Sequence, residues 1–173
     1  MLPWLPEPLD AGRVILRRPA PEDLAGLIGL YLDDEVRRHL GGALDRPTAR
    51  ARAGRTVSEP AWGGFVIVDR GTRELVGSGD LSRKRGPWEL SYQLRRASWG
   101  QGLASEMISS LVDWFFTWMD DDVLIAVTQD ANDRSTRLLE RNGARLRHRF
   151  EQYGALQRWY EFHRDGRHVP GDR

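Results

Sequence analysis

The chain of 173 residues has the length of one ordinary domain, and its 40% hydrophobic and 29% charged residues are typical of a globular protein rather than a disordered one. A formal net charge of +1 makes no general electrostatic case for binding nucleic acid or an anionic membrane. The absence of cysteine excludes disulfides, thiolate metal sites and a cysteine nucleophile. No apolar run approaches the length of about 18 residues that a membrane-spanning helix needs, and the N-terminus lacks the pattern of a secretion signal, so the cytoplasm is the expected compartment.

The N-terminal third of the chain is predicted to hold one strand followed by helices. Residues 1–12, with three prolines, are expected to form an irregular lead-in, and residues 13–18 the first strand. Pro21 and the two acidic residues after it favour a helix start, because proline suits the first turn and acids suit the positive end of the helix dipole. Apolar residues at helical spacing then continue to Leu32.

A second, more polar helical region is expected from Asp34 to Ser58, broken by Gly41-Gly42 and by Pro47. It carries four arginines in its second half, at positions 46, 50, 52 and 55. We interpret them as a solvated helix face, and a patch that contacts substrate is the alternative. These arginines argue against a polycationic ligand.

From residue 64 the apolar pattern changes from helical to strand periodicity. Three strands joined by short turns are followed by a long amphipathic helix, an interior strand, a helix closed by Gly143, and a terminal hairpin. The expected ranges are 64–69, 74–83, 88–95, 103–119, 123–129, 132–142 and 144–164, before a loose tail over 165–173. This order predicts a single α/β domain over residues 1–173, with a mixed, mostly antiparallel sheet of about seven strands and about four helices.

A glycine loop, WGQGLAS over residues 99–105, joins a predicted strand to a predicted helix. Gly100 and Gly102 would let the backbone approach a ligand closely, and the amides from about Gly100 to Ser105 would lie unpaired at the positive end of the helix dipole. The loop therefore suits a phosphate group, or it is only a tight turn. It lacks the Gly-Lys-Ser/Thr ending of a P-loop, and Ser105 replaces the third glycine of a dinucleotide fingerprint.

Two motifs together resemble those of the GCN5-related N-acetyltransferase (GNAT) superfamily. The run ELSYQLRRASWGQGLASE, residues 89–106, is similar to the coenzyme A loop of the RimJ/RimL-like branch, which reads Glu-x-Gly-Tyr-x-Leu, a short turn, and then Trp-Gly-x-Gly-x-Ala-Thr-Glu-Ala. The run NDRSTRLLERNGA, residues 132–144, resembles the family's Asn-x-x-Ser-x-x-x-x-Glu-x-x-Gly-Phe, with Ala144 in place of phenylalanine. The resemblance extends over residues 13–164.

This resemblance implies the site for acetyl-CoA. The strands 88–95 and 123–129 would lie parallel and splay apart to admit the pantetheine arm, and the amide near Leu94 would polarise the thioester carbonyl. No metal is implied. The residues expected to bind the coenzyme are Leu94, Arg95, Trp99, Gly100, Gln101, Gly102, Leu103, Ala104, Ser105, Asn132 and Ser135.

The reaction needs a base, since an amine with a pKa of about 10 must lose a proton before it attacks. Glu89 is the candidate, because it matches the family's acid on the strand that feeds the site. The alternative is a strand carboxylate paired with an arginine.

The leaving thiolate needs a proton donor. Many relatives use a tyrosine where this chain has Leu138 or Leu139, so Ser135 is the first candidate. Tyr153 and Tyr160 are the weaker candidates. Asn132 and Ser135 could alternatively cap a helix.

The sequence as a whole predicts an acetyl-CoA-dependent N-acetyltransferase with direct transfer, because no cysteine can carry the acetyl group. The acceptor is expected to be a protein N-terminal amine or a small amine such as an aminoglycoside or polyamine. The alternative is a coenzyme A-binding module without turnover that senses the cofactor or regulates a partner. The four histidines show no metal-ligand spacing, and the protein is expected to be a monomer or homodimer.

Overall fold

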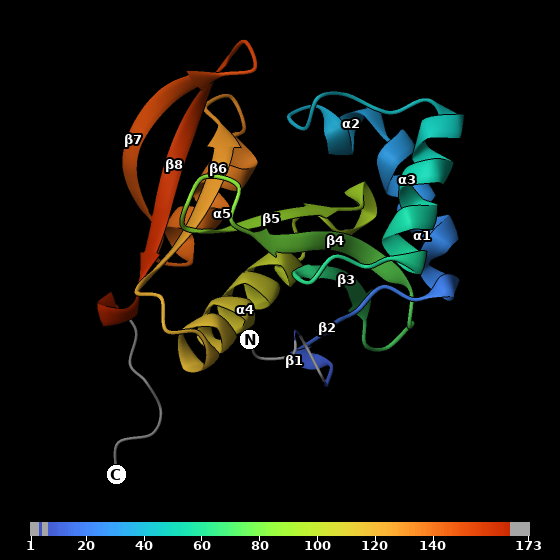
Figure 1. The fold of residues 1–173 in the computed structure, drawn as a ribbon, viewed down its shortest axis with the longest axis horizontal. Coiled ribbons are helices and arrows are strands. Elements are labelled where there is room, and N and C mark those ends of the chain that lie inside the picture. Colours follow the sequence, from blue (N-terminus) through green and yellow to red (C-terminus); the bar gives the residue numbers. More distant parts are fainter. Residues whose placement is uncertain (1–3, 5–6, 167–173) are drawn as a thin grey trace.

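The computed structural model describes residue 4 and residues 7–166. One mixed sheet of eight strands, in the order β1-β2-β3-β4-β5-β6-β8-β7, forms the centre of this part of the chain (Figure 1). The strands are β1 (Leu9–Ala11), β2 (Val14–Arg17), β3 (Gly64–Asp69), β4 (Leu75–Ser82), β5 (Trp88–Leu94), β6 (Val123–Gln129), β7 (Arg145–Gln152) and β8 (Ala155–His163). The helices are α1 (Leu24–Leu32), α2 (Asp34–Arg37), α3 (Arg46–Ser58), α4 (Leu103–Trp118) and α5 (Asp133–Arg141).

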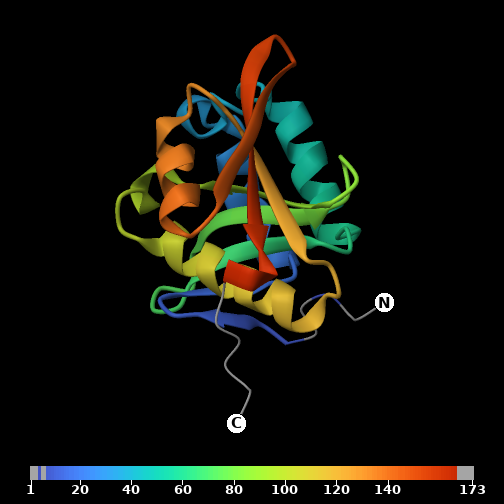
Figure 2. The same cartoon turned by 90° about the vertical axis from the view of Figure 1, so that its left-hand side faces the viewer.

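Strand β3 shows how the sheet is covered on both faces. Its side chains alternate, so that Phe65 and Ile67 join the core under α4, whereas Val66 and Val68 pack with residues of α1 and α3. All four are buried, which explains why this strand is apolar at successive positions. Helix α4 therefore lies on one face of the sheet, and α1 and α3 lie on the other (Figures 1 and 2).

The two central strands separate soon after they meet. Strands β5 and β6 run parallel, but only Trp88 pairs with Leu124 and Glu89 with Ile125 before the strands diverge. Every other neighbouring pair in the sheet is antiparallel. The predicted mixed sheet with a splayed parallel pair is confirmed.

The prediction of an irregular lead-in over residues 1–12 is wrong for its last part. Residues 9–11 form β1, which pairs with β2 through Leu9 opposite Leu16 and Ala11 opposite Val14. Gly12 makes the tight turn possible, because its φ of +73° is a conformation that glycine adopts without steric penalty. The three prolines of residues 1–12 end at Pro8, so they do not prevent residues 9–11 from forming a strand, in which Ala11 is buried.

Three smaller expectations also change. The sheet has eight strands rather than about seven, because β1 is added, and five α-helices occur in the described residues rather than about four. The region 34–58 is two helices, and Pro47 lies in the first turn of α3 instead of breaking a helix. Of the expected loose tail, Asp165 and Gly166 belong to a 3₁₀ turn, and the remainder lies outside the described residues. Within residue 4 and residues 7–166, no helix is long and apolar enough to cross a membrane.

Candidate active site

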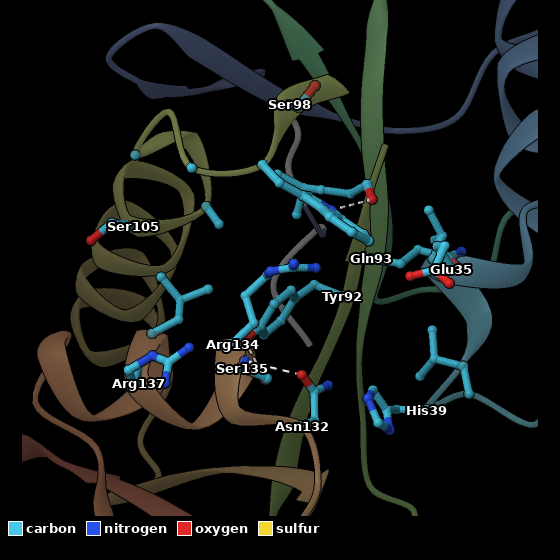
Figure 3. A pocket seen from close by; sticks show the side chains of 18 of the residues that line it. Glu35, His39, Tyr92, Gln93, Ser98, Ser105, Asn132, Arg134, Ser135 and Arg137 are labelled. Atoms are coloured by element: carbon cyan, nitrogen blue, oxygen red, sulfur yellow. Dashed lines mark hydrogen bonds between the residues drawn. The ribbon is translucent and has the colours of Figure 1, made fainter. Parts of the chain in front are cut away.

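A cavity of about 620 Å³ lies where β5 and β6 part. The loop before α4 and the first turns of α5 form one side of it, and α2 with the segment after it forms the other (Figure 3). Eight of the predicted coenzyme-binding residues line it: Leu94, Trp99, Gly100, Gly102, Ala104, Ser105, Asn132 and Ser135. The splayed strands thus bring together two motifs that are about 30 residues apart in the chain.

The glycine loop presents unpaired backbone donors. Gly100 and Gly102 have φ values of +72° and +82°, which turn the chain into α4 with Gly102 as the N-cap residue. Within the described residues, the amides of residues 100–104 donate no hydrogen bond, whereas Ser105 donates to the Gly102 carbonyl at 3.0 Å. Five such donors at the positive end of a helix of 16 residues fit an anionic pyrophosphate.

The loop is held in this shape from both sides. The Trp99 indole donates to the Leu94 carbonyl at 2.9 Å, and the Arg134 guanidinium lies 3.8 Å from the centre of the Trp99 ring. On the outside, Arg13 donates to the Gln101 carbonyl at 2.7 Å and pairs with Glu106. These contacts preorganise the amides before any ligand arrives.

Three further cations line the cavity, and the sequence prediction missed them. Arg134, Arg137 and Arg141 lie along α5 on the side facing the loop (Figure 3 labels the first two). In the part of the chain that the structure describes, none of the three is paired with a carboxylate. Their i, i+3 and i, i+4 spacing places them on one helix face, a signal that the sequence already contained. Unpaired guanidinium groups beside free amides fit the phosphates of a nucleotide-containing ligand.

The register of β5 directs part of its backbone into the gap. The Arg95 amide donates to the Val76 carbonyl at 2.8 Å, so alternate residues of β5 bond to β4. In an antiparallel ladder the residues between them turn their N–H and C=O groups the other way. The amides of Tyr92 and Leu94 therefore face the side from which β6 has departed, where an extended arm can pair with them.

Tyr92 and Ser135 form a hydrogen-bonded pair inside the cavity. Their hydroxyl oxygens are 2.9 Å apart, and the Ser135 backbone amide donates a capping hydrogen bond to the Asn132 carboxamide oxygen at 3.2 Å (Figure 3). Withdrawal of the phenol from water raises the pKa of Tyr92 to about 12, because burial disfavours phenolate. Tyr92 therefore keeps its proton at physiological pH. The sequence motif over residues 89–106 includes Tyr92, but this residue was not predicted from the sequence as a proton donor.

Glu89 lies next to the point where β5 and β6 part, and it lines neither this cavity nor its neighbour. It is 4% exposed, and both carboxylate oxygens accept from Nη1 of Arg85, at 2.7 and 2.5 Å. Arg85 also donates to Gln152 at 2.6 Å. The residue is thus a buried carboxylate paired with arginine that does not line the cavity.

The side chains of three predicted coenzyme-binding residues do not line the cavity. The Arg95 guanidinium lies 3.7 Å from Glu74, the Gln101 side chain donates to the Ala97 carbonyl at 2.5 Å, and Leu103 is buried in the core. The two alternative tyrosines also lie elsewhere: Tyr153 is 87% exposed in the hairpin turn, and Tyr160 donates to Glu140 at 2.8 Å. Among the described residues, no group of three or more acidic or histidine side chains is arranged to hold a metal ion.

A second cavity of about 630 Å³ adjoins the first. Leu40, Tyr92 and Gln93 line both, so the two spaces meet at the middle of β5. The second cavity extends from there between β4 and the α1–α3 side of the sheet. One ligand can thus enter from each side and meet the other at Tyr92.

A splayed parallel strand pair with a glycine loop and free amides at its opening is the arrangement that the resemblance to acetyltransferases implies. The family profile described as "Acetyltransferase (GNAT) domain" matches residues 13–145. The chain belongs to the GNAT family and is an acetyltransferase.

Its curated relatives carry consistent names. The "Uncharacterized N-acetyltransferase YoaA" of Bacillus subtilis is 26% identical over 162 residues, which cover 87% of this chain and 86% of that protein. The "Uncharacterized N-acetyltransferase p20" of Bacillus licheniformis is 28% identical over 141 residues, covering 77% and 79%. Among solved structures, a GNAT-family acetyltransferase from Bacillus anthracis superposes with a TM-score of 0.82 at 19% identity, covering 92% of this chain and 99% of that one. The last comparison supports the fold alone.

Proposed function

We propose that the protein transfers an acetyl group from acetyl-CoA directly to a primary amine. The observation that carries this proposal is the junction of two cavities at Tyr92, one lined by unpaired amides and arginines and the other leading away from it. Acetyl-CoA would supply the activated acyl group. The amides of residues 100–104 would bind its pyrophosphate, the arginines of α5 would pair with its phosphates, and the edge of β5 would bind its pantetheine arm.

Proton removal from the amine is assigned to a carboxylate of β4 or β5. Glu89 is the proposed base, and its burial and pairing with Arg85 mean that it must act through intervening water. Asp80 is the competing candidate, because it lines the second cavity, here called the acceptor cavity, in which the amine would bind. Its carboxylate is 35% exposed and lies 3.3 Å from Lys84.

The other end of the reaction is assigned to β5 and α5. As the amine nitrogen bonds to the acyl carbon, the Leu94 amide is positioned to donate to the carbonyl oxygen, where negative charge develops. When the carbon–sulfur bond breaks, Ser135 would pass a proton to the sulfur and take one from Tyr92. The neutral amine gives one proton to the carboxylate as the nitrogen–carbon bond forms and the carbon–sulfur bond breaks, and the thiolate gains one from the Ser135–Tyr92 pair. Exchange with solvent then returns the carboxylate and Tyr92 to their starting states, so the transfer balances without a covalent enzyme intermediate.

The RimJ/RimL-like branch is proposed from Trp99 and the motif around it. Proteins of this fold take different acceptors. RimL, titled a ribosomal L7/L12 alpha-N-protein acetyltransferase, superposes with a TM-score of 0.74, and a spermidine N-acetyltransferase from Vibrio cholerae, solved with CoA and spermine, with one of 0.71. Fold similarity therefore leaves both a protein N-terminus and a small amine as acceptor classes for this chain.

The test measures thiol release from acetyl-CoA with a panel of primary amines and N-terminal peptides, alongside coenzyme A binding by calorimetry. The expected result is binding together with amine-dependent thiol release. Tight coenzyme binding without turnover on any acceptor would refute the enzyme proposal and favour a sensing or regulatory module.

A further inference from the structure

The acceptor cavity carries an excess of positive charge. Four cationic residues line it, and two acidic ones: Arg37, Arg52, Arg55 and Lys84 against Glu59 and Asp80. Lys84 and Asp80 lie 3.3 Å apart and offset each other. In the described residues the three arginines, here called the arginine cluster, form no ion pair with a carboxylate. An amine-binding cavity lined this way would repel an acceptor that carries only positive charges.

Arg37 is the least ordinary member of the arginine cluster. It is 5% exposed, and its guanidinium donates from Nε to the Gly42 carbonyl at 2.6 Å and from Nη2 to the Leu40 carbonyl at 2.7 Å. Both partners are neutral, and Nη1 has no hydrogen-bond partner among the residues described. Removing a cation from water without a counter-ion costs several kcal/mol. Burial, and after it the charge of Arg52, lowers the pKa of Arg37, as expected for a cation that lacks an anion.

Arg52 is positioned beside it by an aromatic ring. Its guanidinium lies 5.0 Å from the centre of the Tyr31 ring, and the Tyr31 hydroxyl is 3.5 Å from that of Thr56. Helices α2 and α3 thus each contribute one arginine to a pair of like charges, and α1 contributes the tyrosine ring over which Arg52 lies. Two neighbouring guanidinium groups with open donors match the oxygens of a carboxylate or a phosphate.

Where the two cavities meet, one side chain offers a hydrogen-bond acceptor for an amine. Gln93, at the junction with the coenzyme cavity, donates through Nε2 to the Ser78 hydroxyl at 3.1 Å. Its Oε1 is buried and has no hydrogen-bond partner among residue 4 and residues 7–166. A buried carbonyl oxygen without a donor is unfavourable, and the N–H of an incoming amine would satisfy it.

We propose that the acceptor is a small primary amine that also carries a carboxylate or phosphate, bound with its amine at Gln93 and its anionic group at the arginine cluster. This inference rests on the proposed transfer reaction and specifies its substrate class. The cluster holds the anionic end, and the amine end then meets the thioester at Tyr92 in one orientation.

Matched pairs of acceptors test the proposal: 4-aminobutyrate against butylamine, and phosphoethanolamine against ethanolamine, with spermidine as the polycation. We expect kcat/KM for each anionic amine to exceed that of its partner by about tenfold or more, the equivalent of one charge-assisted contact. Arg52→Gln should remove this preference. Arg50→Gln is the control, since it removes the same charge from an exposed position of α3 that does not line the cavity.

Binding of inorganic phosphate supplies a readout that does not need turnover. With coenzyme A saturating its own cavity, phosphate at constant ionic strength should further raise Tm in the wild type and in Arg50→Gln, but not in Arg52→Gln. Equal kcat/KM within the matched pairs, preference for spermidine, or equal loss in both variants would overturn the inference. If no amine is acetylated, the proposed function fails, and the Tm shift with phosphate alone tests the arginine cluster. Absence of that shift from the wild type would overturn the arginine cluster as an anion site as well.

Discussion

Replacing Gly102 with alanine should separate the role of the glycine loop in folding from its role in binding. Gly102 has a φ of +82°, and a Cβ built there would lie 3.1 Å from Nη2 of Arg13. That guanidinium cannot move freely, because it also contacts Glu106 at 2.6 Å and the Gln101 carbonyl at 2.7 Å. The substitution therefore strains the backbone and presses on the contact that shapes the loop.

The two effects have different sizes. A non-glycine residue in the left-handed region costs about 1–2 kcal/mol of stability. For a protein of this length, each kcal/mol lowers Tm by about 2–4 °C. For the ligand, each amide bond to a charged oxygen contributes about 1.5–3 kcal/mol, so loss of one bond weakens coenzyme A binding about 10- to 100-fold.

Gly143→Ala is the matched control. Gly143 has a φ of +88°, a Cβ there would meet no atom within 4 Å, and the residue lies after α5 without lining the coenzyme cavity. Both variants should lose similar stability in thermal unfolding, whereas calorimetric titration with coenzyme A should show a loss only for Gly102→Ala. Unchanged affinity in Gly102→Ala, or an equal loss in Gly143→Ala, would refute the assignment of the loop as a pyrophosphate site.

Three further predictions concern the reacting groups. Tyr92→Phe should lower kcat about 100-fold with coenzyme A affinity unchanged. Because both hydroxyls serve one proton path, the effects of Tyr92→Phe and Ser135→Ala on kcat should be non-additive in the double variant. Full activity of Tyr92→Phe in the thiol-release assay would contradict this path. Because the pKa of Tyr92 is about 12 when folded and about 10 when unfolded, the free energy of unfolding should fall by roughly 2–3 kcal/mol as pH rises between those values. Denaturant titrations should show a shallower fall in Tyr92→Phe, and identical slopes would argue against the buried phenol. Glu89→Gln should slow transfer more than Asp80→Asn at unchanged coenzyme affinity, and the reverse order in kcat would move the base to Asp80.

Local chemistry explains why much of the fold could be predicted. Strands β3 and β6 occupy the predicted residues, because apolar runs of this length between turns have one favourable arrangement in a sheet. Gly143 ends α5 with a positive φ, as the capping pattern predicts. The prediction for residues 9–11 was wrong because a strand of three residues depends on its partner. These residues form a strand only because β2 pairs with them.

The glycine loop illustrates what the sequence by itself determined. The spacing of Gly100 and Gly102 before a helix dictates the left-handed turns and the free amides, which depend on neighbouring residues alone. The sequence also determined the family, because its motifs record those local conformations.

The tertiary structure alone decided how side chains distant in the chain combine. Tyr92 and Ser135 are 43 positions apart, and only the parting of β5 from β6 brings their hydroxyls to 2.9 Å. In the sequence, Arg37 is indistinguishable from the other charged residues of a polar helical region. Packing between helices nevertheless leaves it only 5% exposed, close enough to Arg52 for the two charges to interact. Burial and proximity are set by packing between elements, so pKa values and unpaired charges emerge only when the whole core has formed.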